Sequence, residues 1–532
     1  MSHNYFEDYG YDSCSSRGVC SISTRMASIL EVVILYLKEF AHYALKLEQL
    51  GVKEDNIKNL ILNTLSAFVS NPEIPDNTFA SIICAYAKEL EALKNLYIKS
   101  CEERAIKAEI LDSEFTATKD FNVINSIRIG EQNHSTNPAI EHNKDIRSVQ
   151  ELLFFSAKSI AVYLLELNSY GEDSDYAYTA ILELLDSFNI SNIKKDDIKA
   201  ILYSIAEEEF AIIKRLDAIK RELYGSPTAT EVSLSTHKGK ALLVEGSNTK
   251  ELEEILEATK DTEISIYTHG KLISAHLYPK LRNYKNLKGH FGRGSGNSIL
   301  DFSTFPGAIF VERHSIDNIE NLYRGRIFTN DIIVPKGVVK IENLDYKPLV
   351  TASLEAKGFK NGKKVPPIKL NYEPTNLMRE LEDIDFEQFE GICLITQGND
   401  YYEDTNYFDK LIKLLPRDVL IINFSSPYNE ERVLNINAGY ELNAVFKTVL
   451  TLKNLIDIQD KPIISFVPRC DKHITNLILN LKLLGIKKVF MGKCPAKNIS
   501  PNVVEEFCKL FDITRYGFVK EDYKLFIDYL AL

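Results

Sequence analysis

Residues 241–271 read ALLVEGSNTKELEEILEATKDTEISIYTHGK. Two short apolar runs, at 241–244 and 264–267, flank a segment at 249–258 whose apolar residues recur at helical spacing. A strand, a helix and a strand in this order predict a β-α-β unit, in which the strands lie parallel because the helix carries the chain back along the sheet. We therefore expect an α/β domain built around a parallel sheet.

The same alternation of strands and helices recurs toward the C-terminus. Apolar runs predict further strands at 308–311, 326–334, 392–396, 419–424, 463–467 and 488–491, and helices are predicted at 441–456 and 471–484. A loop-rich stretch at 358–376 separates two groups of these elements. The pattern predicts two α/β domains, at 226–365 and 366–532.

The first 225 residues instead read as successive helices, and they contain an internal repeat. Helices are predicted at 28–50 and 148–169, and Gly51 and Gly171 mark their C-terminal ends. Eight residues recur 120 positions later: Tyr43, Leu45, Leu47, Gly51, Ile61, Leu62, Leu65 and Phe68 match Tyr163, Leu165, Leu167, Gly171, Ile181, Leu182, Leu185 and Phe188. The repeat predicts a helical domain of two duplicated bundles, at about 25–100 and 148–225, joined by a polar connection at 101–147.

The composition indicates a folded protein and argues against two classes of partner. Hydrophobic residues make up 45% of the 532 residues and charged residues 26%, as in globular proteins. The net charge of −12 disfavours a surface that binds nucleic acid or an anionic membrane. The apolar stretch at 26–37 is too short to span a bilayer, no signal peptide is recognisable, and eight cysteines are too few for a disulfide framework. We expect a cytoplasmic protein with no nucleic-acid or membrane partner.

Seven separated strings occur in the order and at the separations of one protein family. They are Gly18-Val19-Cys20, Asp145-Ile146-Arg147-Ser148, Tyr267-Thr268-His269-Gly270, Ala275-His276-Leu277-Tyr278-Pro279, Phe305-Pro306-Gly307-Ala308-Ile309, Arg326-Ile327-Phe328-Thr329 and Ser500-Pro501-Asn502-Val503. From about Cys14 to its C-terminus the chain resembles the hybrid-cluster proteins, also called prismane proteins or hydroxylamine reductases. The resemblance implies a helical domain of two bundles followed by two Rossmann-like domains, as above. It also implies two metal clusters.

Only half of the family's N-terminal cluster motif is present. The family places C-x2-C-x8-C-x5-C around a cubane iron–sulfur cluster, and Cys14 and Cys20 reproduce its last five-residue gap. The first two cysteines would fall at Ser2 and Tyr5. Because each iron of a four-iron cluster needs an external ligand, two thiolates cannot complete it alone. Cys14 and Cys20 are therefore either residual metal candidates or two ordinary thiols.

The residues that hold the family's second, hybrid cluster are all replaced. The resemblance implies one His, two Glu and four Cys as ligands. Their positions carry Ser247 for the His, Lys271 for the first Glu, Ser315, Gly398, Ser426 and Glu441 for the four Cys, and Cys470 for the second Glu. Lys472 matches a family lysine beside the cluster. A serine hydroxyl binds iron more weakly than a thiolate, and an ammonium at position 271 repels iron cations.

These replacements lead to two hypotheses. The first is a degenerate paralogue without redox chemistry, with no catalytic residue and no cofactor, that acts as a binding, scaffold or assembly protein through an unknown protein partner or self-association. The second is an iron–sulfur oxidoreductase of the hydroxylamine or nitric-oxide reductase type with a remodelled metal site. We further expect Lys271 and Glu441 to approach within ion-pair distance, or through one water, at the former cluster position. A zinc site at Cys470, His473 and Cys494 is a weaker alternative.

Overall fold

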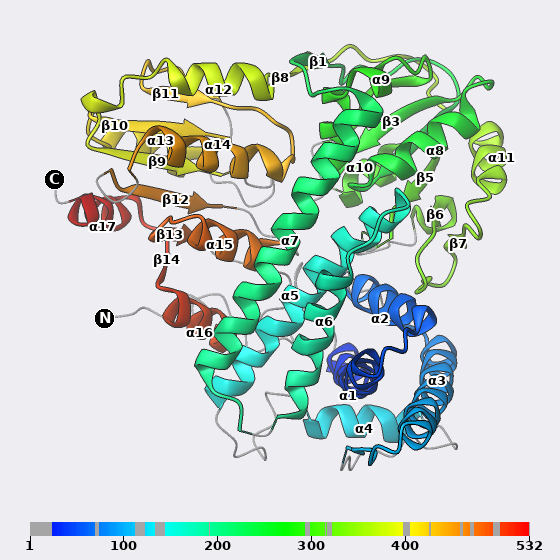
Figure 1. The fold of residues 1–532 in the computed structure, drawn as a ribbon. Coiled ribbons are helices and arrows are strands. Elements are labelled where there is room, and N and C mark those ends of the chain that lie inside the picture. Colours follow the sequence, from blue (N-terminus) through cyan, green and yellow to red (C-terminus); the bar gives the residue numbers. More distant parts are fainter. Residues whose placement is uncertain are drawn as a thin grey trace.

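Figure 1 shows the fold, a computed structural model in which a helical domain is followed by two α/β domains. The structure describes residues 24–530 except 70–73, 112–122, 134–143, 191, 293–297, 314, 316–321, 397–404, 425–426, 458–460, 469–472 and 493–500. The fold class is therefore the one that the sequence predicts.

The helical domain carries the predicted repeat as two sets of three helices. The helices are α1 (Thr24–Gln49), α2 (Asp55–Ala67), α3 (Asp76–Glu103), α4 (Val123–Asn133), α5 (Lys144–Ser169), α6 (Asp175–Asp186) and α7 (Lys195–Tyr224). The starts of α5 and α6 keep the offset of 120 residues from those of α1 and α2 (144 − 24 and 175 − 55). Gly51 and Gly171 follow α1 and α5 with φ of +74° and +80°, a backbone conformation that glycine adopts without strain.

The two copies also pack against each other, in addition to the contacts of α1 with α3 and of α5 with α7 within each copy. Helix α1 packs against α6 of the other copy, and α2 packs against α5. The repeated apolar residues, such as Ile61 and Leu65 with their counterparts Ile181 and Leu185, are fully buried in one continuous core. The repeat is visible in the sequence because both copies must supply the same buried stripe to each other.

The connection between the copies contains a helix that the sequence analysis does not predict. Helix α4 lies within the stretch at 101–147 that we expected to be a polar connection, and it packs against α1. Gly130 makes this contact possible, because a Cβ atom there would lie 2.0 Å from the backbone oxygen of Ser28. The helix is only 11 residues long and carries a glycine in its interior, which disfavours a helical prediction from the sequence.

The first α/β domain is a parallel sheet of six strands in the order β4-β3-β2-β5-β6-β7. Its elements are β2 (Ala241–Glu245), α8 (Thr249–Thr259), β3 (Ser265–His269), the 3-10 helix η3 (Gly270–Leu277), α9 (Pro279–Arg282), β4 (Leu287–His290), α10 (Ser298–Thr304), β5 (Ala308–Val311), β6 (Ile327–Thr329), β7 (Val339–Lys340) and α11 (Lys347–Glu355). The predicted strand at 326–334 is shorter than expected, because the Thr329 hydroxyl accepts a hydrogen bond from the Asp331 backbone and turns the chain.

The second α/β domain has a parallel sheet in the order β11-β10-β9-β12-β13-β14. Its elements are α12 (Pro374–Glu382), β9 (Gly391–Ile395), α13 (Thr405–Leu414), β10 (Val419–Asn423), β11 (Val433–Asn435), α14 (Leu442–Leu455), β12 (Ile463–Val467), α15 (Ile474–Leu483), β13 (Lys488–Met491), α16 (Pro501–Phe511), β14 (Ile513–Arg515) and α17 (Val519–Leu530). A small antiparallel pair, β1 (Thr230–Val232) with β8 (Ile368–Leu370), links the two α/β domains. In both sheets the order reverses next to the first strand, as in doubly wound folds.

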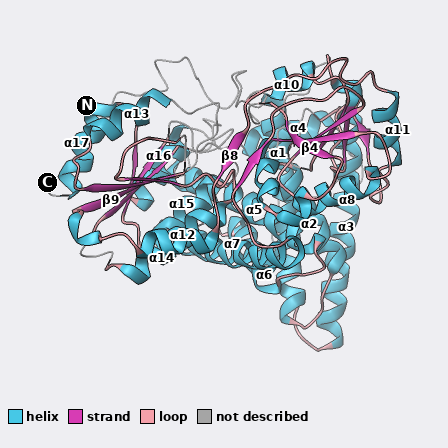
Figure 2. Cartoon of the chain, turned by 90° about the horizontal axis from the view of Figure 1, so that it is seen from above, coloured by secondary structure: helices cyan, strands magenta, loops and turns pink. Residues whose placement is uncertain are grey.

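Helix α7 lies where the three domains meet. Figures 1 and 2 show it between the two sheets, and it packs against α14 and α15 of the second α/β domain and α9 of the first. The strand ends of both sheets face this junction, which is where doubly wound folds bind ligands. Within the described residues, one helical stretch, 148–169, is long and apolar enough to cross a membrane, and 72% of its most apolar window is buried in the core of the helical domain.

Candidate functional site

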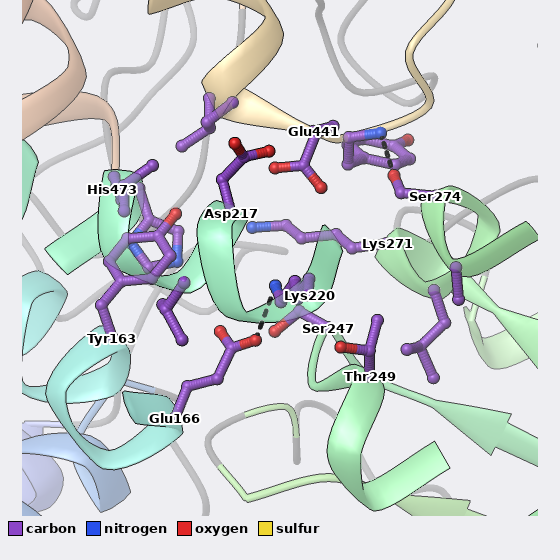
Figure 3. A pocket seen from close by; sticks show the side chains of 16 residues that line it. Tyr163, Glu166, Asp217, Lys220, Ser247, Thr249, Lys271, Ser274, Glu441 and His473 are labelled. Atoms are coloured by element: carbon purple, nitrogen blue, oxygen red, sulfur yellow. Dashed lines mark hydrogen bonds and ion pairs between the residues drawn. The ribbon is translucent and has the colours of Figure 1, made fainter. Parts of the chain in front are cut away.

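The interdomain pocket, a cavity of about 60 Å³, lies at this three-domain junction. Figure 3 shows that charged side chains from different domains point into it. Its polar and charged lining residues are Tyr163, Glu166, Asp217, Lys220, Ser247, Thr249, Lys271, Ser274, Tyr440, Glu441 and His473. Among the described residues that line the pocket, none is a cysteine.

Two helices of the second α/β domain begin at the pocket. Glu441 is the N-cap of α14 and His473 is the N-cap of α15, and neither side chain accepts a hydrogen bond from the first turn of its helix. The first backbone N–H groups of a helix have no acceptor within it, so an uncapped N-terminus is a source of hydrogen-bond donors and positive potential. The pocket therefore combines side-chain charges with helix termini.

Lys220 is the central cation of the pocket. Its ammonium lies 2.7 Å from Glu166 of α5, and both side chains are about 90% buried. Burial alone would lower the pKa of Lys220, but the carboxylates of Glu166 and Glu441 hold the pKa above its ordinary value. Lys220 is consequently a fixed positive charge at neutral pH.

Asp217 lies one turn before Lys220 on α7 and also lines the pocket. Its Oδ2 pairs with Lys447 of α14 and Arg221 of α7, each at 2.9 Å. The other oxygen, Oδ1, has no hydrogen-bond partner, although Asp217 is only 3% exposed. A buried carboxylate oxygen without a donor is costly, so Oδ1 remains able to accept a further hydrogen bond.

Glu441 is the third acid of the pocket, and it belongs to the second α/β domain. Burial raises the pKa of its carboxyl group, the nearby Lys220 lowers it, and Asp217 raises it further. The Tyr278 hydroxyl of the first α/β domain donates a long hydrogen bond of 3.4 Å to Glu441. This acid therefore joins two domains and remains weakly hydrogen-bonded.

The structure brings together three of the residues at former ligand positions. Ser247, Lys271 and Glu441 all line the pocket, and Figure 3 shows the Lys271 side chain extending toward Asp217 and Glu441. The direct Lys271–Glu441 ion pair stays a prediction. Ser315 follows β5, donates its N–H to the Glu312 carbonyl oxygen at 3.1 Å, and is not among the lining residues.

The remaining predicted site residues lie outside the described part of the chain. They are Cys14, Cys20, Gly398, Ser426, Cys470 and Lys472, and Cys494 of the zinc alternative is outside it too. His473, the one described member of that alternative, lies 2.8 Å through Nδ1 from the Ser159 hydroxyl and packs on the Tyr163 ring.

Ser247 has acquired a structural partner. Its backbone N–H and its hydroxyl both donate to Glu312 Oε2, which also accepts the N–H of Asn248. Asn248 in turn caps α8 with its side chain. The carboxylate thus satisfies donors just before a helix N-terminus, a favourable position for an anion. Ser247, where the resemblance implies a histidine ligand, therefore lies in the hydrogen-bonded turn that begins α8.

Sequence reasoning missed the pocket residues of the helical domain. Glu166, Asp217 and Lys220 lie on long amphipathic helices, where charged residues usually face solvent. A signal exists in retrospect, because Asp217 and Lys220 sit three positions apart next to the apolar stripe of α7. The spacing alone does not distinguish a buried pair from a solvated one.

A second buried ionic cluster lies behind the pocket in the first α/β domain. His269 Nδ1 contacts Glu245, and His269 Nε2 lies 3.1 Å from Asp301. Burial lowers the pKa of His269, but these carboxylates outweigh it and raise the pKa to about 9. His276 instead bonds the Thr268 hydroxyl at 2.9 Å. Both histidines have the hydrogen-bonding role that fits a structural position.

Comparison with known proteins agrees with this architecture over nearly the whole chain. The family model described as "Prismane/CO dehydrogenase family" matches residues 11–524. The chain belongs to this family. The resemblance that the separated strings indicated is thereby confirmed.

Its relatives include proteins named hydroxylamine reductase. That of Syntrophobacter fumaroxidans is 24% identical, with 96% of this chain and 97% of the relative covered. That of Kosmotoga olearia is 26% identical, with 97% of each chain covered. Among solved structures, the α subunit of an acetyl-CoA synthase/carbon monoxide dehydrogenase with NiZn[Fe4S4] and NiNi[Fe4S4] clusters matches 98% of this chain and 84% of its own, at 11% identity and a TM-score of 0.48.

Family membership corrects one expectation. The prediction that the chain has no cofactor is wrong, because the family to which the chain belongs is one of iron–sulfur proteins, and the alternative, an iron–sulfur cluster, agrees with the comparisons. The prediction extended the loss of ligands at one site to the whole chain. Several cysteines, including Cys14, Cys20 and Cys470, lie outside the described residues.

The described residues of the pocket nevertheless do not fit the hybrid cluster. Lys271 lines the pocket with an ammonium, and the Ser247 hydroxyl is bonded to Glu312. Iron–sulfur clusters need anionic thiolate ligands, and a cation in a buried site repels iron. We therefore derive no chemical step through a cluster held by these residues.

Proposed function

We propose that the interdomain pocket is a binding site for a small polar ligand, which it holds by ion pairs and hydrogen bonds instead of a hybrid cluster. In this proposal the chain is a binding protein of the hybrid-cluster family. The observation that carries the proposal is the charge of the pocket, where Lys220 and Lys271 lie among the buried carboxylates of Glu166 and Asp217 and the half-buried carboxylate of Glu441.

The unpaired carboxylate oxygen of Asp217 supports a ligand-binding pocket over a former site that has filled with side chains. A site that no longer binds a ligand is expected to fill with apolar side chains, because unpaired buried polar groups are destabilising. Here the cavity persists and Asp217 Oδ1 lacks a partner.

A second candidate function is reduction of hydroxylamine. The observation that favours it is the name of relatives that match 96% of this chain or more. Such a reaction needs electrons from a metal centre, which would have to use residues other than the described pocket side chains. Cys470 is the one cysteine at a former ligand position.

One anaerobic experiment separates the two functions. The protein is purified without oxygen, its iron and acid-labile sulfide are measured, and it is assayed with reduced viologen and hydroxylamine. For the binding function we expect turnover no higher than in buffer. Turnover well above buffer that disappears in Cys470→Ser would reject the binding function and establish the reductase.

The proposal extends to the setting of the protein. We propose a cytoplasmic location and either an unknown protein partner or self-association, in keeping with a net charge of −12 that disfavours nucleic acid. Native mass measurement of the protein from its source cell tests this, and a purely monomeric mass without any bound chain would contradict it.

A further inference from the structure

We propose that the ligand of the interdomain pocket is a small zwitterion of the α-amino-acid class, with its ammonium on Asp217 and its carboxylate near the start of α14. This inference rests on the proposed binding function and specifies its ligand. It follows from the donors and acceptors that the pocket leaves open, from its charge and from its size.

The acceptor side of the pocket requires a donor-rich group. Asp217 is 97% buried and lines the pocket, its Oδ2 is already paired with Lys447 and Arg221, and among the described residues Oδ1 has no hydrogen-bond partner. Glu441 nearby accepts only the long bond from Tyr278. An ammonium group has three donors and no acceptor, and so it satisfies both carboxylates at once.

The donor side requires an anion. Helix α14 is 14 residues long and begins at the pocket, and the side chain of its N-cap Glu441 makes no capping hydrogen bond. The N–H groups of Leu442 and Asn443 have no acceptor within the helix. Lys271 and Lys220 add two positive charges to the lining. Backbone N–H groups at a helix start, together with lysines, bind carboxylates well.

Charge balance favours a ligand that carries both signs. The carboxylates of Glu166, Asp217 and Glu441 face the ammonium groups of Lys220 and Lys271, while Lys447 and Arg221 balance Asp217 from its other side. A lone anion would meet three acids, and a lone amine would meet two lysines. A zwitterion leaves the net charge of the pocket unchanged and pairs with each side.

The size of the cavity limits the ligand to a few atoms. A volume of about 60 Å³ holds roughly four to six waters if each needs about 10–15 Å³. Zwitterionic glycine has about five non-hydrogen atoms and alanine about six, which is similar to that number of waters. A side chain as large as that of leucine exceeds the cavity.

The test compares the whole ligand with its two halves on the full-length protein. Binding of glycine, L-alanine, L-leucine, acetate and methylammonium is measured by titration calorimetry, with thermal unfolding as a second readout. We expect glycine and alanine to bind at least about tenfold more tightly than acetate or methylammonium, and leucine not to bind. This comparison needs no variant and so does not depend on the folding of a mutant.

Asp217→Asn locates the ammonium half of the ligand. This substitution keeps the side-chain size but removes the charge, and we expect it to weaken glycine binding about tenfold or more while acetate binding does not fall. The matched control is Glu506→Gln, because Glu506 is also buried and also pairs with a residue of α7, Lys195, at 2.6 Å. Lys195 lies 22 residues before Asp217 on that helix (217 − 195). It should leave glycine binding unchanged.

The outcomes separate this inference from the binding function on which it rests. Acetate or methylammonium binding as tightly as glycine, with sensitivity to Asp217→Asn, would overturn the zwitterion and leave the binding function standing. Glycine binding that Glu506→Gln weakens as much as Asp217→Asn would overturn the placement on Asp217. No binding of any of the five compounds would overturn both.

Discussion

At the residue scale, buried charged side chains make the stability of the protein depend on pH. His269 is clamped between Glu245 and Asp301, and its raised pKa of about 9 means that the folded protein holds a proton there which the unfolded chain releases near pH 6.5. The stabilisation by this proton is complete below about pH 6.5 and is lost as the pH rises through about 9.

We predict that His269→Gln removes this pH dependence. Between about pH 6.5 and 9 the wild-type protein should lose stability relative to the variant by roughly 1 kcal/mol for each pH unit, which is the free energy of a proton held in the folded state alone. His276, whose pKa is lowered to about 4, and His290, whose pKa is also lowered, are neutral in the folded protein over this range. Denaturant unfolding at several pH values measures the difference.

Comparing the wild type with His269→Gln separates the contribution of His269 to the pH dependence from that of other groups that titrate in this range. Burial raises the pKa of Glu251 to about 8, and burial lowers that of Lys158 to about 7. Both groups are present in the wild type and in the variant, so their contributions cancel in the difference. His237→Gln, an exposed histidine of the same domain, is the control, and equal slopes for wild type and His269→Gln would contradict the prediction.

At the element scale, close contact between helices depends on single glycines. We predict that Gly130→Ala separates α4 from α1, because its Cβ would lie 2.0 Å from the Ser28 oxygen, and backbone atoms cannot move aside as a flexible side chain can. The cost should be about 1–3 kcal/mol, typical of overpacking. Limited proteolysis should cut near α4 sooner than in the wild type. Gly325→Ala is the control, since no atom lies within 4 Å of a Cβ there.

The elements themselves were largely predictable from the sequence. The strands at 308–311, 463–467 and 488–491 occur with the expected bounds, because fully buried parallel strands are uninterrupted apolar runs. The edge strands β7 and β14 and helix α4 were not predicted, since an edge strand or a helix held by one glycine contact needs no such run.

The candidate site was predictable only in part. The resemblance located Ser247, Lys271 and Glu441, which the structure brings into one pocket. It could not locate Asp217 or Lys220, because their burial arises from packing among three domains and not from local sequence. These pocket contacts come from residues that look like ordinary surface charges in a single helix.

At the scale of the whole molecule, Lys220 holds acids from two domains. We predict that Lys220→Met lowers the free energy of unfolding by about 3–5 kcal/mol, because it leaves Glu166 buried and uncompensated and also removes the positive charge near Glu441. Chemical denaturation at pH 7 measures this. The exposed pair of Lys53 with Asp175 provides the control, and Lys53→Met should cause no detectable change. A similarly small effect of Lys220→Met would show that this lysine does not compensate the acids.

The packing of the two helical copies against each other has a consequence for synthesis on the ribosome. Because α1 packs against α6 and α2 against α5, the first copy emerges without the surface that it must cover. Synthesis proceeds at about 5–20 residues per second, so the 120-residue offset leaves the apolar faces of the first copy exposed for roughly 6–24 seconds before the second copy is made. Nascent chains arrested after α3 should therefore recruit chaperones, and release once α6 has emerged.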